Sequence, residues 1–542
     1  MPTDAQSYIK RYEELRGDRR NWEHHWQEVA EVILPRRTDI VGSRTPGDKR
    51  NLKAIDSTGI IANELLAAGL HGMMTNPASK WFTLRISNQA LNQEAAVKMW
   101  LENVERIIYE ELSSSESSFS SHIHELYLDL SAFGTAVMFI GESDQTKDLM
   151  FTALPLKECY VSENSDGRID TLYRKFELSV RQIVQKFGDK ESDVGKEVLE
   201  RYNNDKLEDK FEIIHAIFPR HDYDKRKKTR QNKPIASVYV LCKSEMILDE
   251  GGFEESPILA PRWSKASGEV YGRGPGMATL PDVKMLQQMS KTILKAAQKI
   301  VDPPLQLEDD SVMLPVRTIP GGLNYRRSGS DPIQPLATGG NIPIGLEMMQ
   351  DVRLRIREGF FLDQLSLQQG PQMTATEVLQ RTEEKLRLLG PVMGRLQSEL
   401  LSPLINRVFG LLGRQNKLPP IPEELQDQSY TIEFVSPLAR AQRQVEANSL
   451  LRVFEIGSTV IQMQPESGRV FKGEDTMRWL SDLFGIPMSI LESRQETADR
   501  RSAEQEQAQM AQQMAMVEQG ANVLNKAAPV ANVLNQATAA ET

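Results

Sequence analysis

The middle of this chain constrains its fold most, because two amphipathic helices flank a segment too rich in proline and glycine to be helical. The first helix is predicted over residues 281–300 and the second over residues 346–361, each with an apolar stripe at helical spacing. Between them, residues 301–343 can form only short strands and turns. We therefore expect two helices that carry an extended excursion between them.

Each of these helices also carries charges of one sign opposite its apolar stripe. The first has a lysine stripe, which consists of Lys284, Lys291, Lys295 and Lys299. The second has an acidic stripe, which consists of Glu347, Asp351 and Glu358, with Arg353 and Arg357 flanking its apolar face. We expect the two stripes to neutralise each other within or between subunits and to set register. The alternative is that each stripe is a solvated helix face.

Loops border this helical pair on both sides. The glycine-rich entry Tyr271-Gly-Arg-Gly-Pro-Gly276 lacks the spacing and the strand-to-helix context of a dinucleotide site, so a turn is expected. Residues 363–373 read as a loop rich in uncharged glutamines, namely Gln364, Gln368, Gln369 and Gln372. Thr374 and Glu377 then form a predicted capping box that opens a long helical run to about residue 413. Gly390-Pro391 and Ser402-Pro403 are expected to kink or segment this run.

The rest of the chain alternates between helical and strand-like patterns, so we expect a mainly α fold with α+β parts. Asp56 or Ser57 is expected to cap the helix over 57–74, with Leu65, Leu66 and Leu70 as its buried stripe. Helices are predicted over 4–34, 57–74, 93–112, 123–133, 180–187, 438–463 and 474–491, and strands over 137–140, 150–154, 211–219, 237–242 and 430–435.

Composition narrows the class of protein. The chain has 542 residues, 40% of them hydrophobic, and a net charge of −10, which argues against wrapping nucleic acid over most of the surface. A basic cluster at residues 225–233 is either a hairpin tip or a phosphate-contacting loop. The two cysteines, Cys159 and Cys242, are too few for a disulfide framework. The N-terminus lacks a signal-peptide pattern, and no apolar run could span a bilayer, so we expect a soluble protein without stable membrane insertion.

Catalytic motifs are not found, so we expect no enzyme activity, no cofactor and no metal site. Gly195-Lys196-Glu197 lacks the hydroxyl residue with which a phosphate-binding loop holds magnesium. His122 and His124 flank Ile123 without the helical spacing or the third ligand of a zinc site. As a candidate nucleophile, Cys159 has no obvious histidine partner, and serine nucleophile elbows are not found either.

Several stretches, taken in order, resemble the head-to-tail connector, or portal, proteins of short-tailed bacteriophages. The resemblance spans about residues 8–415 and is weakest in the last hundred residues. It rests on Arg20-Asn-Trp22-Glu23 with Trp26 and Leu34-Pro35, Asp56-Ser-Thr-Gly59, Leu66-Ala-Ala-Gly-Leu70, Asn76-Pro77 with Trp81-Phe82, Val270-Tyr-Gly-Arg-Gly-Pro-Gly-Met277 and Thr374-Ala-Thr-Glu-Val378.

This resemblance implies a portal fold that assembles into a dodecameric ring at one capsid vertex of the virion. Duplex DNA would pass through the ring during packaging and ejection, and assembly would take place in the host cytoplasm. The implied parts are a wing (1–270 and 374–437), two stem helices (271–300 and 344–362), a clip (301–343), a tunnel loop (363–373), a crown (438–500) and a C-terminal helical tail or barrel (501–542).

Partners and contact residues are implied in the same way. The resemblance implies contacts with major capsid and scaffolding proteins, with terminase, and later with tail adaptor or tail tube proteins. Clip docking would use Arg317, Tyr325, Arg326 and Arg327, and the channel would be lined by the four loop glutamines with Arg353 and Arg357. The alternatives are another ring-forming tail or capsid-vertex protein and, from a different class, a DNA-processing enzyme with an unrecognised site.

Overall fold

A computed structural model of the chain describes most of its residues. The described residues are 4–42, 47, 53–77, 80–86, 88, 91, 94–143, 146–227, 229–306, 325, 328, 334–335, 342–365, 389–426, 432–434, 449–457, 473–484, 490 and 496–514. They form two compact units. Unit 1 comprises Met1–Leu84, Val104–Pro419 and Ile432–Ala439, and unit 2 comprises Arg85–Asn103, Pro420–Thr431 and Arg440–Thr542.

The largest sheet of unit 1 is antiparallel, with the strand order β4-β5-β6-β7-β8. Its strands are β4 (Cys159–Glu163), β5 (Ile169–Ser179), β6 (Lys210–Pro219), β7 (Ile235–Leu241) and β8 (Met246–Phe253). Strands β6 and β7 agree with the predicted runs, whereas β4, β5 and β8 were not predicted.

Helices cover both faces of this sheet because its strands are apolar on both sides. Tyr8 and Tyr12 of α1 (Ala5–Val32) form one core cluster with Ile214 and Val238. On the other face, Ile183 joins a second cluster that includes Ile213, Leu241 and Val198. The helices of that face are α5 (Val180–Phe187), α6 (Glu191–Val194) and α7 (Lys196–Asn203).

A second, three-stranded antiparallel sheet has the order β3-β2-β9. It consists of β2 (Val137–Glu142), β3 (Leu149–Leu154) and β9 (Ile258–Leu259). Helices α2 (Thr58–Met74) and α4 (Phe119–Phe133) pack on each other. The short elements η1 (Pro35–Arg37), η3 (Leu156–Glu158) and β12 (Ile432–Phe434) also belong to unit 1. Strand β1 (Leu84–Ile86) and helix α3 (Ala95–Ser113) each have residues in both units.

Helix α2 confirms its predicted range but corrects its predicted stripe. Leu66 and Leu70 are fully buried, whereas Leu65, which was expected beside them, is 53% exposed. The cap comes from Asp56, whose Oδ1 accepts a hydrogen bond from the Thr58 amide at 2.9 Å, while the Ser57 side chain makes no capping bond. The predicted apolar stripe was therefore one residue too wide.

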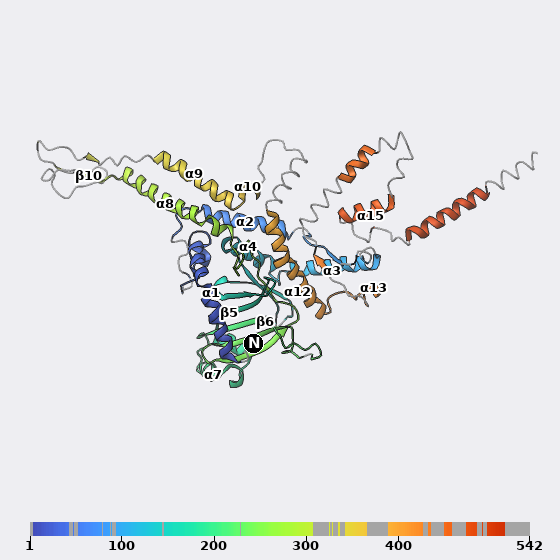
Figure 1. The fold of residues 1–542 in the computed structure, drawn as a ribbon, viewed down its shortest axis with the longest axis horizontal. Coiled ribbons are helices and arrows are strands. Elements are labelled where there is room, and N and C mark those ends of the chain that lie inside the picture. The colour runs from blue at the N-terminus through green and yellow to red at the C-terminus, as the bar shows by residue number, and fades with distance from the viewer. Residues whose placement is uncertain are drawn as a thin grey trace, which may run out of the picture. The chain divides into compact units, whose positions relative to one another are not determined.

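The predicted pair of central helices is present as α8 (Pro275–Val301) and α9 (Ile342–Gly359), which lie side by side in Figure 1. Helix α8 begins six residues before its predicted start, with Pro275 in its first turn and Pro281 in its interior. Proline is tolerated in a first turn because the amide there needs no helical partner. Beyond these helices, β10 (Leu305–Gln306) pairs with β11 (Gln334–Pro335).

The chain after α9 turns sharply and becomes helical again. Phe361 has a positive φ of 58°, and α10 (Leu362–Leu365) follows, so the predicted loop 363–373 begins with a helical turn. Residues 389–396 are helical and run through the π-helix η4 (Gln397–Leu401) into α12 (Ser402–Arg414). The widened turn directly precedes Ser402-Pro403, where an interruption was predicted. The capping box at Thr374 and Glu377 lies outside the described residues.

Unit 2 is mainly helical in its described parts. These parts include α13 (Glu423–Gln426), residues 449–457, α15 (Gly473–Phe484) and residues 496–514. Glu474 pairs with both Arg478 and Arg501, which ties α15 to the helix that follows it. No helix in the described parts of either unit combines the length and apolarity needed to cross a bilayer.

Candidate functional site

The α8/α9 pair is fixed to the body of unit 1 through a buried glutamine. Gln287 of α8 is 8% exposed, and its Oε1 accepts hydrogen bonds from the amides of Ile55 at 2.6 Å and Asp56 at 2.8 Å. Its Nε2 donates to the carbonyl oxygen of Asp56 at 2.6 Å. All these partners lie directly before α2. The buried glutamine side chain therefore provides hydrogen-bond partners for three backbone groups of the segment directly before α2.

A second contact ties α9 to the same point. The Nη2 of Arg353 lies 2.7 Å from Oδ2 of Asp56. Burial acts to raise the pKa of Asp56, but hydrogen bonds from Thr58 and Arg353 outweigh it, so this pKa lies below its ordinary value. Arg353, which was predicted to face the channel, is thus engaged within the chain. Asp56, Gln287 and Arg353, the anchor from here on, join α8 and α9 to α2.

Within the described part of one chain, Lys284 is the one member of the two charge stripes that forms an ion pair, and its partner belongs to neither stripe. The Nζ of Lys284 lies 2.8 Å from Oε2 of Glu28 in α1, not beside the acidic stripe. The remaining members, Lys291, Lys295, Lys299, Glu347, Asp351 and Glu358, are all exposed. Among the described residues, no ion pair within the chain joins the lysine stripe to the acidic stripe. Pairing of the stripes between subunits stays a prediction.

The glycine-rich entry to α8 is explained by close backbone packing. A Cβ atom at Gly272 would lie 2.4 Å from the carbonyl oxygen of Gly134, and one at Gly276 would lie 2.6 Å from the carbonyl oxygen of Ala132. A Cβ atom at Gly274 would lie 2.8 Å from the Gly134 amide nitrogen. These glycines let the start of α8 pass directly over the end of α4. Where a turn was expected, residues 272–274 are irregular backbone that leads directly into α8.

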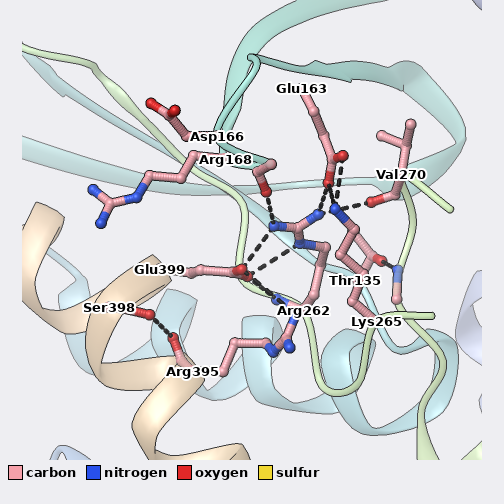
Figure 2. A network of polar contacts seen from close by, with 12 residues as sticks. Thr135, Glu163, Asp166, Arg168, Arg262, Lys265, Val270, Arg395, Ser398 and Glu399 are labelled. Atoms are coloured by element: carbon pink, nitrogen blue, oxygen red, sulfur yellow. Dashed lines mark hydrogen bonds and ion pairs between the residues drawn. The ribbon is translucent and has the colours of Figure 1, made fainter. Parts of the chain in front are cut away.

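A buried arginine holds the segment that leads into α8 (Figure 2). The side chain of Arg262 is 1% exposed, and its Nη2 lies 2.7 Å from Oε1 of Glu399 in η4. Its Nη1 pairs with Glu163 of β4 and donates to the carbonyl oxygen of Val270 at 3.1 Å. Lys265 also pairs with Glu163, at 2.6 Å. The network therefore connects a strand, a helix and the loop before α8, and no sequence pattern predicted it.

Several predicted contact residues lie outside the described residues, at least in their side chains. Gln368, Gln369, Gln372, Arg317, Arg326 and Arg327 are not described, and Gln364 is described only in its backbone, within α10. Tyr325 is 69% exposed. Arg357 lies 3.7 Å from Oδ1 of Asp363, across the turn that joins α9 to α10. The channel and docking roles of these residues remain predictions.

The residues considered for catalysis or metal binding are found in other environments. Cys159 is buried, which raises the pKa of its thiol to about 12, so it is a packing residue rather than a nucleophile. His124 lies near His71, with ring centroids 5.8 Å apart. In the described part of the chain, no group of three or more histidine, cysteine, aspartate or glutamate residues could hold a metal ion.

The basic cluster at 225–233 lies in the loop between β6 and β7, which agrees with a hairpin tip. Arg230 pairs with Asp249 of β8 at 2.7 Å. Lys225, Arg226 and Lys227 are exposed. A phosphate contact at this tip stays a prediction.

Comparison with known proteins gives one consistent family. Residues 5–491 match the family described as "Bacteriophage head to tail connecting protein". The chain is 36% identical over 544 residues to the "Probable portal protein" of Bordetella phage BPP-1, covering 97% of this chain and 95% of that protein. It is 32% identical over 538 residues to the "Portal protein" of Salmonella phage epsilon15, covering 97% and 96%. The "Portal protein" of Enterobacteria phage T3 is 21% identical over 434 residues, covering 76% and 75%.

Proposed function

This chain belongs to the family of bacteriophage head-to-tail connecting proteins and is a phage portal protein, and we propose that twelve copies form a ring at one capsid vertex. Portal proteins are virion components at the junction of head and tail. The ring would assemble in the host cytoplasm, conduct double-stranded DNA during packaging and ejection, and have a structural rather than a catalytic role. The α8/α9 pair and its anchor carry the proposal.

The proposal is supported by the α8/α9 pair, whose two helices pack on each other, are fixed to α2 and carry charges on their exposed faces. Val283 and Leu286 of α8 are buried together with Val352 and Ile356 of α9, so the pair is a packed unit. The anchor then fixes its base to α2. A conduit wall needs such stiffness because a moving duplex exerts force on it. Helices α8 and α9 therefore act as the stem of the portal.

The other parts follow in order along the chain. The wing comprises 1–270 and 374–437, the clip 301–343, the tunnel loop 363–373 and the crown 438–500, with a helical tail or barrel over 501–542. The clip docks first the terminase and then tail proteins through Arg317, Tyr325, Arg326 and Arg327. Major capsid and scaffolding proteins surround the ring at the vertex.

DNA passes the constriction without being gripped. Each chain has a net charge of −10, so the assembled ring repels a polyanion in general. The loop residues Gln364, Gln368, Gln369 and Gln372 are uncharged and can touch DNA without releasing many counterions. Arg353 and Arg357 are each paired with a carboxylate in the chain, which weakens their hold on phosphate. The loop slows backward slippage of packaged DNA.

Deleting residues 364–372 tests the tunnel loop. Rings should still form, because the anchor and the helical pair are untouched, whereas retention of packaged DNA should fall. Retention is measured as nuclease-protected DNA per particle. Loss of ring assembly in the deletion variant would contradict a role limited to DNA retention.

The ring itself is tested by the mass of the purified full chain in solution. Mass photometry should detect a species with the mass of twelve 61.2 kDa subunits. Negative-stain electron microscopy of the same sample should show rings with a central hole. A monomer at all concentrations would contradict the proposed ring, and nuclease and ATPase assays on the same sample would detect an enzyme instead.

A further inference from the structure

A groove runs between α2 on one side and α9 with α10 on the other. Its volume is about 400 Å³. Its apolar lining comes from Ile61, Ala62 and Leu65 of α2, Leu354 of α9 and Leu362 of α10. Ile61, Leu65 and Leu354 are each about half exposed, at 50%, 53% and 54%. Single exposed apolar side chains are ordinary, but three that converge on one groove mark a contact surface.

The rim of this groove is acidic. Glu64 stands beside Leu65 on α2, and Asp351 and Glu358 stand on either side of Leu354 along α9. Among the described residues, no ion pair engages these three carboxylates, whereas the groove arginines Arg353 and Arg357 pair with Asp56 and Asp363. The charge that the groove presents to a partner is therefore negative.

The complementary surface is the exposed face of α8. Leu294 and Val301 lie seven residues apart, on one side of this helix, and are 53% and 86% exposed. Lys291 and Lys295 are exposed beside Leu294. Apolar side chains accompanied by lysines match an apolar groove with an acidic rim. Within the described residues of one chain, no ion pair joins the two surfaces, so each has its charge available for another molecule.

We propose that the groove between α2 and α9 receives the lysine face of α8 from a neighbouring copy of this chain. Two different surfaces that complement each other produce a head-to-tail contact, which closes into a ring when the rotation per subunit allows. The lysine stripe then faces carboxylates of the neighbour instead of DNA. This inference rests on the proposed ring and adds which surfaces close it.

Charge reversal on each side tests the pairing. Asp351→Lys with Glu358→Lys reverses the rim, and Lys291→Glu with Lys295→Glu reverses the α8 face. Each double variant should raise the subunit concentration needed for half-assembly at least about 10-fold, because like charges then meet at the contact. The quadruple variant restores opposite charges and should recover most of the assembly, since residues in contact do not act additively.

An apolar variant tests the groove floor. Leu354→Asp should also weaken assembly at least about 10-fold, because it places a charge among the apolar lining. The matched control is Met150→Asp on β3, which is 43% exposed and lies outside the groove. Circular dichroism and thermal melting of each variant establish that the subunit remains folded, and mass photometry over a concentration series measures assembly.

The outcomes separate the inference from the proposed ring. Loss of assembly in folded single-side variants, with recovery in the quadruple variant, supports the contact. Assembly equal to that of the wild type in all variants overturns it, and so does loss without recovery, because a different neighbour surface must then fill the groove. A wild-type chain that forms no ring at all overturns the proposed ring, and this inference with it.

Discussion

Arg262 and Glu399 are 137 residues apart in the chain and form a bidentate ion pair inside unit 1. The Nη2 of Arg262 lies 2.7 Å from Oε1 of Glu399, and its Nε lies 3.2 Å from Oε2. The Arg262 amide also donates to Oε2 at 2.9 Å. The carboxylate of Glu399, in the π-helical turn η4, thus binds both the side chain and the backbone amide of Arg262. Arg262 lies in the segment that leads to α8.

Replacing Arg262 by alanine should destabilise unit 1 strongly. The substitution removes the bidentate partner of Glu399 and leaves Glu163 with Lys265 alone. Removing one partner of a buried ion pair costs about 3–5 kcal/mol. The free energy of unfolding is measured by urea titration with tryptophan fluorescence.

The control for this prediction is Arg106→Ala. Arg106 pairs with Glu110 at 2.9 Å, but both side chains are more than half exposed, at 58% and 61%. Exposed pairs of this kind contribute about 0–1 kcal/mol. Equal losses of stability in the two variants would contradict the structural role of Arg262.

Glycine 276 should not tolerate a side chain. Gly276→Ala places a Cβ atom 2.6 Å from the Ala132 carbonyl oxygen, so the backbone of α4 or α8 must shift. Overpacking of this kind costs about 1–3 kcal/mol.

The matched control is Gly17→Ala in α1, where a Cβ atom meets nothing within 4 Å. Alanine is a better helix former than glycine, so this variant should gain up to about 1 kcal/mol. Thermal melting compares the two, and a Gly276→Ala protein as stable as the wild type would refute the close packing.

The anchor predicts a local change in amide exchange. In Gln287→Leu, the amides of Ile55 and Asp56 lose the Oε1 atom that accepts their hydrogen bonds. Their hydrogen exchange should accelerate, while exchange in the distant sheet β4–β8 should not change. The neighbouring exposed residue provides the control, because Gln288→Leu removes no bond to these amides. Unchanged protection of both amides in Gln287→Leu would contradict the anchor.

Acid should weaken the five-stranded sheet through His215. This residue is buried on β6, stacks on Tyr239 with centroids 3.9 Å apart, and has its Nε2 2.9 Å from Ser237 Oγ. Burial, with Lys186 and Arg174 nearby, holds the pKa of His215 well below its ordinary value, so the folded state binds its proton less readily than the unfolded state.

The stability that depends on neutral His215 is therefore present above about pH 6.5 and is lost as the pH falls towards the folded pKa. The free energy of unfolding should decline below that pH, and His215→Gln should decline less steeply. An identical pH profile in both proteins would rule out His215 as the source, and exposed His221→Gln serves as the control.

Local periodicity was sufficient to predict elements with one clear apolar pattern. The helices α1, α2 and α5 and the strands β2, β3, β6 and β7 match their predicted ranges within a few residues. Strand β5 was missed because charged residues interrupt its apolar pattern. The structure accounts for two of those charges, since Lys175 pairs with Glu212 of β6 at 2.8 Å and Arg174 pairs with Glu158 of η3 at 2.9 Å. Ion pairs with other segments leave no signature in one segment of sequence.

Helices α8 and α9 were predicted for the same reason, whereas their attachments to the rest of unit 1 were not. Gln287 contacts residues 231 and 232 positions earlier, and Arg262 contacts a residue 137 positions later. No local spacing encodes such contacts. One signal was present at Gln287, a polar side chain beside Leu286 on the buried side of α8. Buried polar side chains need hydrogen-bond partners, so a buried Gln287 implies an attachment at this point of α8.

If α8 and α9 form the wall of a DNA conduit, cryo-electron microscopy of the assembled full chain should show them there. We expect a ring of twelve subunits whose central hole is lined by the α8/α9 pair, with the α2 groove of each subunit filled by its neighbour. A ring that carries this helical pair on its outer rim, or particles without a central hole, would contradict it.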